Sequence, residues 1–374
     1  MQMILNYFKK TWRSWLALIA LVAVTACFFA TNAQLYHDPI AKITSVQTDT
    51  TGQQSDPYGN RVETYKQTIE TKLLNTNDRG KTIRLTNDYD ESGALNVKLK
   101  QGQQVFLTHD SNMNWSVKNV RHDLLWVPFM VLVLGVMTIL MGRHGRIMLL
   151  TLGLNVALFI CFIFLNIAIP HSNLFVVFIP FAILTTLFTL GLLMGFKSRQ
   201  TWTIVMTVLL TSAVTLLISK IVFMLLHNQG VYYEHMEFVT DNPSTLFMAM
   251  TLVGVLGAVM DEATDMTATL FSMQRERPNI SSKELIKAGR NIGGEIFGAL
   301  NNVLFLIFIA EQLPMAVLYL RNGNSWSFTY MTNLSIGMLQ TLISAIGIVL
   351  TVPIGLMCFK LMTFRSLQNK GGQL

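Results

Sequence analysis

The chain has 374 residues, of which 51% are hydrophobic and only 13% are charged, and its formal net charge is +7. This composition excludes a soluble enzyme built around one large core and is typical of a membrane protein with several spanning helices. The net positive charge gives no reason to expect a nucleic-acid partner, because the distribution of the cationic residues has a simpler explanation.

Eight apolar segments are long enough to cross a lipid bilayer. They cover roughly residues 15–33, 124–142, 147–167, 174–195, 202–226, 246–271, 292–312 and 329–359. Lys and Arg concentrate in alternate connections, whereas the opposite short loops contain only Arg321. The positive-inside rule therefore predicts that both termini are cytoplasmic and that residues 34–120 are extracytoplasmic.

Residues 1–33 are predicted to form a cytoplasmic N-terminus and the first transmembrane anchor. A cleaved signal peptide is the alternative, but the apolar run is long enough to span the bilayer, which favours retention. In both cases the following residues are exported.

Residues 34–120 are predicted to be a small extracytoplasmic β-rich domain. The stretch 45–60 has the composition of a linker, and a short helix is expected over 64–74. Strands are expected at the following positions: 81–86, 94–97, 104–108 and 114–119. The His residues here match no zinc pattern and the three Cys residues all lie in apolar segments, so we expect no metal, no cofactor and no disulfide framework.

Residues 121–374 are predicted to form a seven-helix transmembrane domain, with a cytoplasmic amphipathic linker over 272–290. Within this linker, Ser281 and Ser282 are expected to cap a short separate helix. Lys220 lies inside an apolar segment. Its ammonium either reaches the membrane surface, which we favour, or pairs with an intramembrane carboxylate.

The strongest functional signal is a group of acidic residues in the middle of the sixth apolar segment, namely Asp261, Glu262 and Asp265. Small and acidic residues recur there at helical spacing, so they share one face: Gly254, Gly257, Ala258, Asp261, Thr264, Asp265, Ala268 and Ser272. Carboxylates facing hydrocarbon at this depth would cost several kcal/mol. We therefore expect this face to meet another helix, a cation, a proton or water.

The next two apolar segments carry matching polar faces. In the seventh segment the polar and small residues are Gly293, Gly294, Glu295, Gly298, Asn301 and Asn302, and in the eighth they are Asn333, Gln340, Thr341 and Ser344. We expect Glu295 near the inner boundary, and the two asparagines at the depth of Asp265. Together the three faces would line an ion pathway, with the glycines allowing close packing. The alternative is a polar packing interface.

Several of these residues resemble the YibE/F family of predicted bacterial membrane proteins. They are the run Gly257 to Asp261, then Gly289, Ile292, Gly293, Gly298 and Asn302. The resemblance implies a bacterial plasma-membrane protein with one anchor, an outer β-rich domain and a multi-helix bundle. It also implies a homo-oligomer, or a hetero-oligomer with a shorter relative. Asp261 falls on the family's acidic position, and Glu295 stands where the family usually has Asp.

The sequence departs from the family pattern at two places. Glu262 and Asp265 occupy positions that are more often apolar or small, so the additional acidic groups are a feature of this chain. Asn301 and Asn302 lie in what is otherwise a Thr-rich stretch.

Two functions are consistent with these patterns. The first is an ion- or proton-coupled transporter with Asp261 as the coupling carboxylate, supported by Asp265, Glu295 and Asn302. The second is a non-transporting envelope scaffold that acts through its outer domain and a paralogous partner. An enzyme is not expected, because the sequence contains no nucleophile elbow, HExxH motif or P-loop.

Overall fold

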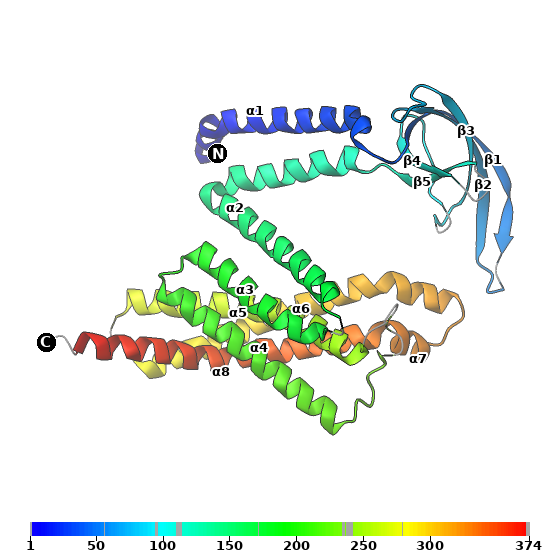
Figure 1. Cartoon of the computed structure of the whole chain (residues 1–374). Helices are drawn as coiled ribbons and strands as arrows, with labels where there is room; N and C mark the ends of the chain where they lie inside the picture. Colours follow the sequence, from blue (N-terminus) through cyan, green and yellow to red (C-terminus); the bar gives the residue numbers. More distant parts are fainter. Residues whose placement is uncertain are drawn as a thin grey trace. The chain divides into compact units, whose positions relative to one another are not determined.

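The structure is a computed structural model that describes residues 2–55, 57–93, 96–109, 114–170, 172–233, 236, 242–278 and 280–371. It is mostly helical, with a small β-sheet near the N-terminus (Figure 1). The chain divides into two compact units, Met1–Arg146 and Ile147–Leu374.

The first unit contains a helix, a five-stranded sheet and the first arm of a long second helix. Its elements are α1 (Gln2–Thr31), the short helix η1 (Asn32–Leu35), β1 (Ile40–Ser55), β2 (Arg61–Leu73), β3 (Thr82–Asp90), β4 (Gln104–His109), β5 (Trp115–Val120) and the beginning of α2 (Asp123–Ala168). The strands are antiparallel in the order β3-β2-β1-β4-β5. α1 packs against the first arm of α2, where Leu18 occupies the space that a side chain at Gly135 would fill.

The two longest strands occupy the stretches for which a linker and a helix are predicted from the sequence, so both predictions are wrong. β1 and β2 pair along their length, from Ala41 opposite Leu73 to Ser55 opposite Arg61. Every second residue of β2 from Gln67 to Leu73 is buried. Threonine fits this half-buried pleated surface well, and cross-strand packing therefore outweighs a local composition that reads as loop.

The remaining strand predictions agree with the structure, except for one. The predicted strands 81–86, 104–108 and 114–119 correspond to β3, β4 and β5. For the predicted strand 94–97, the first two residues lie outside the described residues and the last two are not in a strand.

A buried arginine connects the sheet to η1 and to the beginning of α2. The Arg121 guanidinium donates to the Asp123 carboxylate, to Gln104 Oε1 at 2.6 Å and to Asn32 Oδ1, and it lies 4.8 Å from the centre of the Tyr36 ring. The Tyr36 hydroxyl donates to Asp123, and this hydrogen bond together with burial raises the pKa of Tyr36. Nothing in the spacing of these residues along the sequence indicates the cluster.

The chain contains seven helices that are long and apolar enough to cross a membrane, counted over the residues that the structure describes. Eight separate segments are predicted from the sequence, and the difference lies in α2. This helix has 46 residues and is interrupted at Gly142, whose φ of 58° is readily adopted by glycine. The two arms of α2 on either side of Gly142 correspond to the predicted segments 124–142 and 147–167.

The second unit is a helical bundle. It contains the second arm of α2, α3 (Leu174–Met194), α4 (Arg199–Leu225), α5 (Pro243–Glu276), α6 (Ser282–Arg321), α7 (Trp326–Thr329), the π-helical turn η3 (Tyr330–Leu334) and α8 (Ser335–Gly371). α8 packs against α4, α5 and α6, and α3 packs against α4 and α5. The largest core cluster includes Phe178, Ile204, Phe247, Val255 and Val259.

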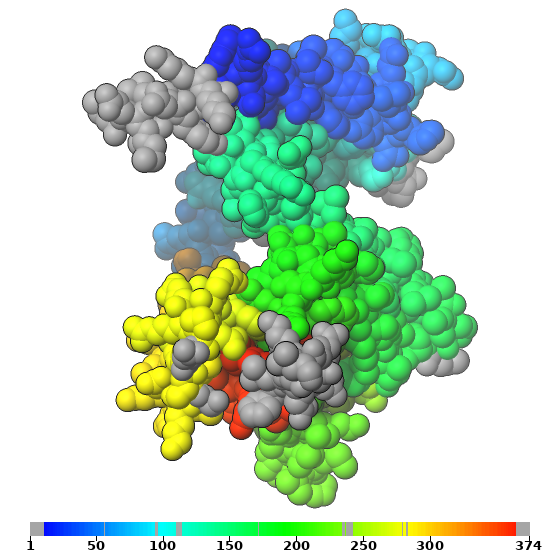
Figure 2. All heavy atoms as spheres, turned by 90° about the vertical axis from the view of Figure 1, so that its left-hand side faces the viewer, coloured from blue at the N-terminus to red at the C-terminus, as the bar shows by residue number. Residues whose placement is uncertain are grey.

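The predicted amphipathic linker is not a separate element. α5 continues to Glu276, and α6 runs without a break from Ser282 to Arg321. The predicted cap at Ser281 is confirmed, since its side chain accepts from the amide of Glu284 in a complete capping box. Helix α6 continues through its glycines because α8 packs closely on two of them, Leu356 against Gly289 and Val352 against Gly293. Figure 2 shows this part of α6, in yellow, beside the end of α8, in red.

Candidate carboxylate site and pocket

Glycines of α8 set the relative depth of the residues on α4, α5 and α8. An added Cβ at Gly347 would lie 3.1 to 3.4 Å from Val259, Val255 and Thr215. An added Cβ at Gly355 would lie 2.2 Å from Met266, which is a clash, and 3.2 Å from Thr207. α8 therefore runs parallel to α5 and antiparallel to α4. At the level halfway between these contacts lie Glu262 of α5, Thr211 of α4 and Thr351 of α8.

Glu262 is completely buried, with 0% of its surface exposed. It shares a helix face with Val259 and Met266, the residues that contact α8, so it faces the seam between α4 and α8. Neither carboxylate oxygen has a hydrogen-bond partner among the described residues. A buried carboxyl group without partners is costly, and such groups in membrane helices commonly bind a proton or an ion.

The hydroxyl groups around Glu262 are mostly satisfied within their own helices. Thr207 and Thr215 of α4 each donate to the carbonyl four residues earlier, and Thr351 of α8 donates to the carbonyl of Gly347. The hydroxyl of Thr211 is buried without a partner. The level of Glu262 therefore holds two polar side chains without partners, on adjacent helices. Among the described residues, no three His, Cys, Asp or Glu side chains are grouped to hold a metal ion.

Asp261 and Asp265 lie on the opposite side of α5 from its buried face. Both are exposed, as is Gly257 one turn before Asp261, while Thr264 is half-buried. Of the small and acidic face predicted from the sequence, Gly257, Asp261 and Asp265 are left exposed by the single chain, whereas Ala258 is buried and Gly254 packs against Gln340. A different face of α5 is turned inward, because its residues Val255, Val259 and Met266 fit against the glycines of α8. The bundle therefore buries this apolar face, and Glu262 with it.

The polar face of α6 is also open. Glu295 and Asn302 are exposed and Asn301 is half-buried, and a side chain added at Gly294 or Gly298 would meet no atom within 4 Å. Gly289 contacts Leu270 of α5, which places Glu295 level with Asp265 on the antiparallel neighbouring helix. The two asparagines, which were expected at that depth, instead lie about level with Gly257.

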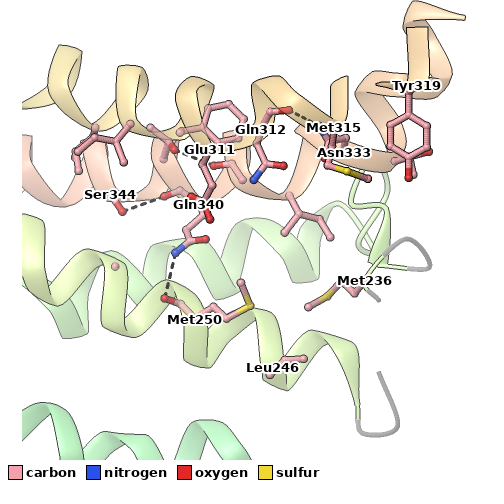
Figure 3. Close-up of a pocket in the computed structure, with 18 residues that line it drawn as sticks. Met236, Leu246, Met250, Glu311, Gln312, Met315, Tyr319, Asn333, Gln340 and Ser344 are labelled. Atoms are coloured by element: carbon pink, nitrogen blue, oxygen red, sulfur yellow. Dashed lines mark hydrogen bonds between the residues drawn. The ribbon is translucent and has the colours of Figure 1, made fainter. Parts of the chain in front are cut away.

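The predicted polar stripe of α8 lines an open pocket between α5, α6 and α8 with a volume of about 690 Å³ (Figure 3). Asn333, Gln340, Thr341 and Ser344 all contribute to its wall. Two amide groups connect the helices across it: Gln340 donates to the carbonyl of Met250 at 3.3 Å, and Asn333 donates to the carbonyl of Gln312 at 3.0 Å.

The pocket also contains residues that the sequence analysis missed. Glu311 and Gln312 of α6 line it, and both follow an apolar run without any spacing that relates them to α8. Its wall includes the π-helical turn at Tyr330–Leu334, where the hydroxyl of Thr332 is buried without a partner. π-Helical turns are frequent at functional sites.

The pocket reaches the acidic face of α5. Gly254 lines the pocket, in contact with Gln340 of α8. Asp261 follows Gly254 by seven residues, which is two helical turns, so the two residues share a face and are separated by about 10 Å along the axis.

Comparison with known protein families identifies the chain. A model described as YibE/F-like protein matches residues 129–365, and one described as YibE/F family N-terminal domain matches residues 34–120. The chain belongs to the YibE/F family. The resemblance inferred from the residues around Asp261 is therefore confirmed. The first model covers all of the candidate carboxylates of this YibE/F chain, and the second covers the β-sheet domain. No curated protein and no solved structure matches it significantly.

Proposed function

We propose that this YibE/F chain is a proton- or ion-coupled transporter, or a subunit of a transport complex, in the bacterial plasma membrane, with both termini in the cytoplasm and the β-sheet domain outside. The observation that carries the proposal is Glu262, whose carboxyl group is completely buried in an apolar bundle without a hydrogen-bond partner. Such a group changes its interactions strongly when it gains or loses a proton or an ion.

In this proposal the pocket with Glu311 and Gln340 is the outer entrance. The acidic face with Asp261 and Asp265 continues from it toward the inner side, where Glu295 is level with Asp265. We assign the coupling role to Glu262 and not to Asp261. Glu262 lies where α4, α5 and α8 meet, so a change in its charge would alter the packing of these three helices.

Proton uptake into liposomes tests the transporter proposal. With purified protein, an inward-directed membrane potential and an internal pH-sensitive dye, we expect the wild type to acidify the lumen. We expect Glu262→Gln to reduce uptake to the level of protein-free liposomes, because the amide cannot release a proton. The matched control is Glu276→Gln, an exposed carboxylate at the end of the same helix, which should leave uptake unchanged. Normal uptake by Glu262→Gln would contradict the proposal.

A second candidate function, a non-transporting assembly subunit, is favoured by the open acidic faces of α5 and α6. Gly257, Gly294 and Gly298 have no atoms within 4 Å of an added side chain, although small residues in membrane helices usually mark close helix contacts. In hydrocarbon, Asp261 and Asp265 would need cover. A second copy of this chain or a shorter relative of the family would provide it.

Oligomeric state tests this second candidate. Gly257→Leu adds a side chain into open space, so the single chain should fold normally, but a neighbouring helix could no longer approach. Blue-native electrophoresis should then show loss of the oligomer, whereas Gly153→Leu, at another open glycine of the bundle, should keep it. Identical migration of both variants and the wild type would rule out an interface at this face.

A further inference from the structure

An apolar groove lies between α3, α4 and α5, apart from the carboxylates described above. Its volume is about 380 Å³, and its walls are formed by aliphatic and aromatic side chains with two polar exceptions, Ser212 and Lys220. Ser212 is 3% exposed and is one of the residues that line the groove, and its buried hydroxyl has no partner among the described residues. Grooves of this kind bind long apolar molecules that carry a few polar groups.

The end of the groove at Lys220 adjoins a more polar pocket of about 230 Å³, which shares Phe175, Lys220 and Met248 with it. Part of the polar wall of this second pocket comes from the beginnings of two helices, with Asn173 capping α3 and Ser244 in the first turn of α5, and Asn228, which follows α4, also contributes. The N-terminus of a helix carries partial positive charge. The pocket therefore combines one ammonium and two positive helix ends.

Lys220 is exposed, and no carboxylate of the described residues lies within salt-bridge distance of it. Of the two interpretations offered by the sequence, pairing with an intramembrane carboxylate therefore has no support in the described residues. Lys220 and Ser212 are eight residues apart on α4, which is about 12 Å along the helix. A bound molecule would thus need a negative group at one end and an apolar body that extends two helical turns into the membrane.

We propose that these two pockets form one binding site for an anionic phospholipid. The phosphate lies against Lys220 and the first turns of α3 and α5. One acyl chain occupies the apolar groove and extends along α4 from Lys220 past Ser212. The positive-inside topology places the site in the outer leaflet.

Native mass spectrometry of the full-length protein in neutral detergent, titrated with phosphatidylglycerol and with phosphatidylcholine, tests the proposal. The wild type should prefer phosphatidylglycerol. Lys220→Gln should weaken phosphatidylglycerol binding by about tenfold, through loss of one charge-assisted contact, and Lys220→Arg should restore it. Lys197→Gln, an exposed lysine near the opposite end of α4, is the matched control and should bind like the wild type.

Two further measurements separate the headgroup from the chain. Ala213→Phe fills the groove while leaving Lys220 in place, and it should weaken phosphatidylglycerol binding as well. Glycerol phosphate, which has no acyl chain, should neither bind nor compete. The proposal is overturned if Lys220→Gln keeps the preference for phosphatidylglycerol, or if glycerol phosphate competes as well as the lipid.

Discussion

Replacing Glu262 with methionine is expected to stabilise the purified protein by about 1–3 kcal/mol, the usual cost of leaving a buried polar group without a partner. Methionine has a similar length and is flexible enough to fill the same space between α4 and α8. The measurement is the midpoint of thermal unfolding in detergent. The same variant should take up no protons in the liposome assay, so stability and function would change in opposite directions.

The matched control for this prediction is Glu295→Met. Glu295 is exposed on the open face of α6, so its replacement should change the free energy of unfolding by less than about 0.5 kcal/mol. Destabilisation of the Glu262→Met variant would show that the carboxyl group makes a stabilising contact with bound water or an ion. That result would contradict our description of the Glu262 carboxyl group as unpaired.

Replacing Arg121 with methionine is expected to destabilise the first unit by about 3 kcal/mol. This is the lower end of the range for breaking a buried ion pair, because the Asp123 side chain is still 22% exposed whereas that of Arg121 is fully buried. The change also leaves Gln104 Oε1 and Asn32 Oδ1 without their donor. Chemical denaturation followed by tryptophan fluorescence measures the effect, since Trp115 lies in the same sheet.

Lys118 provides the control for Arg121. Its ammonium lies 2.7 Å from the Asp38 carboxylate, but both side chains are about half exposed. Solvent screens such pairs, so Lys118→Met should cost less than about 1 kcal/mol. Equal losses from the two substitutions would mean that burial of the Arg121 cluster contributes nothing to stability.

Local sequence is a good guide to the long helices of this molecule and a poor guide to the two longest strands of its β-sheet; Figure 1 shows both parts. The apolar runs predict the long helices well, because a spanning helix must satisfy its backbone internally and its limits follow from hydropathy. In the β-sheet domain, short-range composition is misleading over β1 and β2. Their stability comes from pairing between residues that are far apart in sequence, such as Ala41 with Leu73.

The sequence by itself predicts the long apolar helices, although as eight segments where the described residues form seven helices, and it indicates the cap at Ser281 and the family to which the chain belongs. It also identifies the acidic group at Asp261, Glu262 and Asp265. Only the tertiary structure decides which of the three is buried. Helical periodicity defines the stripes of α5, but the choice of the inward stripe depends on how Val259 and Met266 fit against Gly347 and Gly355 of another helix, and this fit places Glu262 inside.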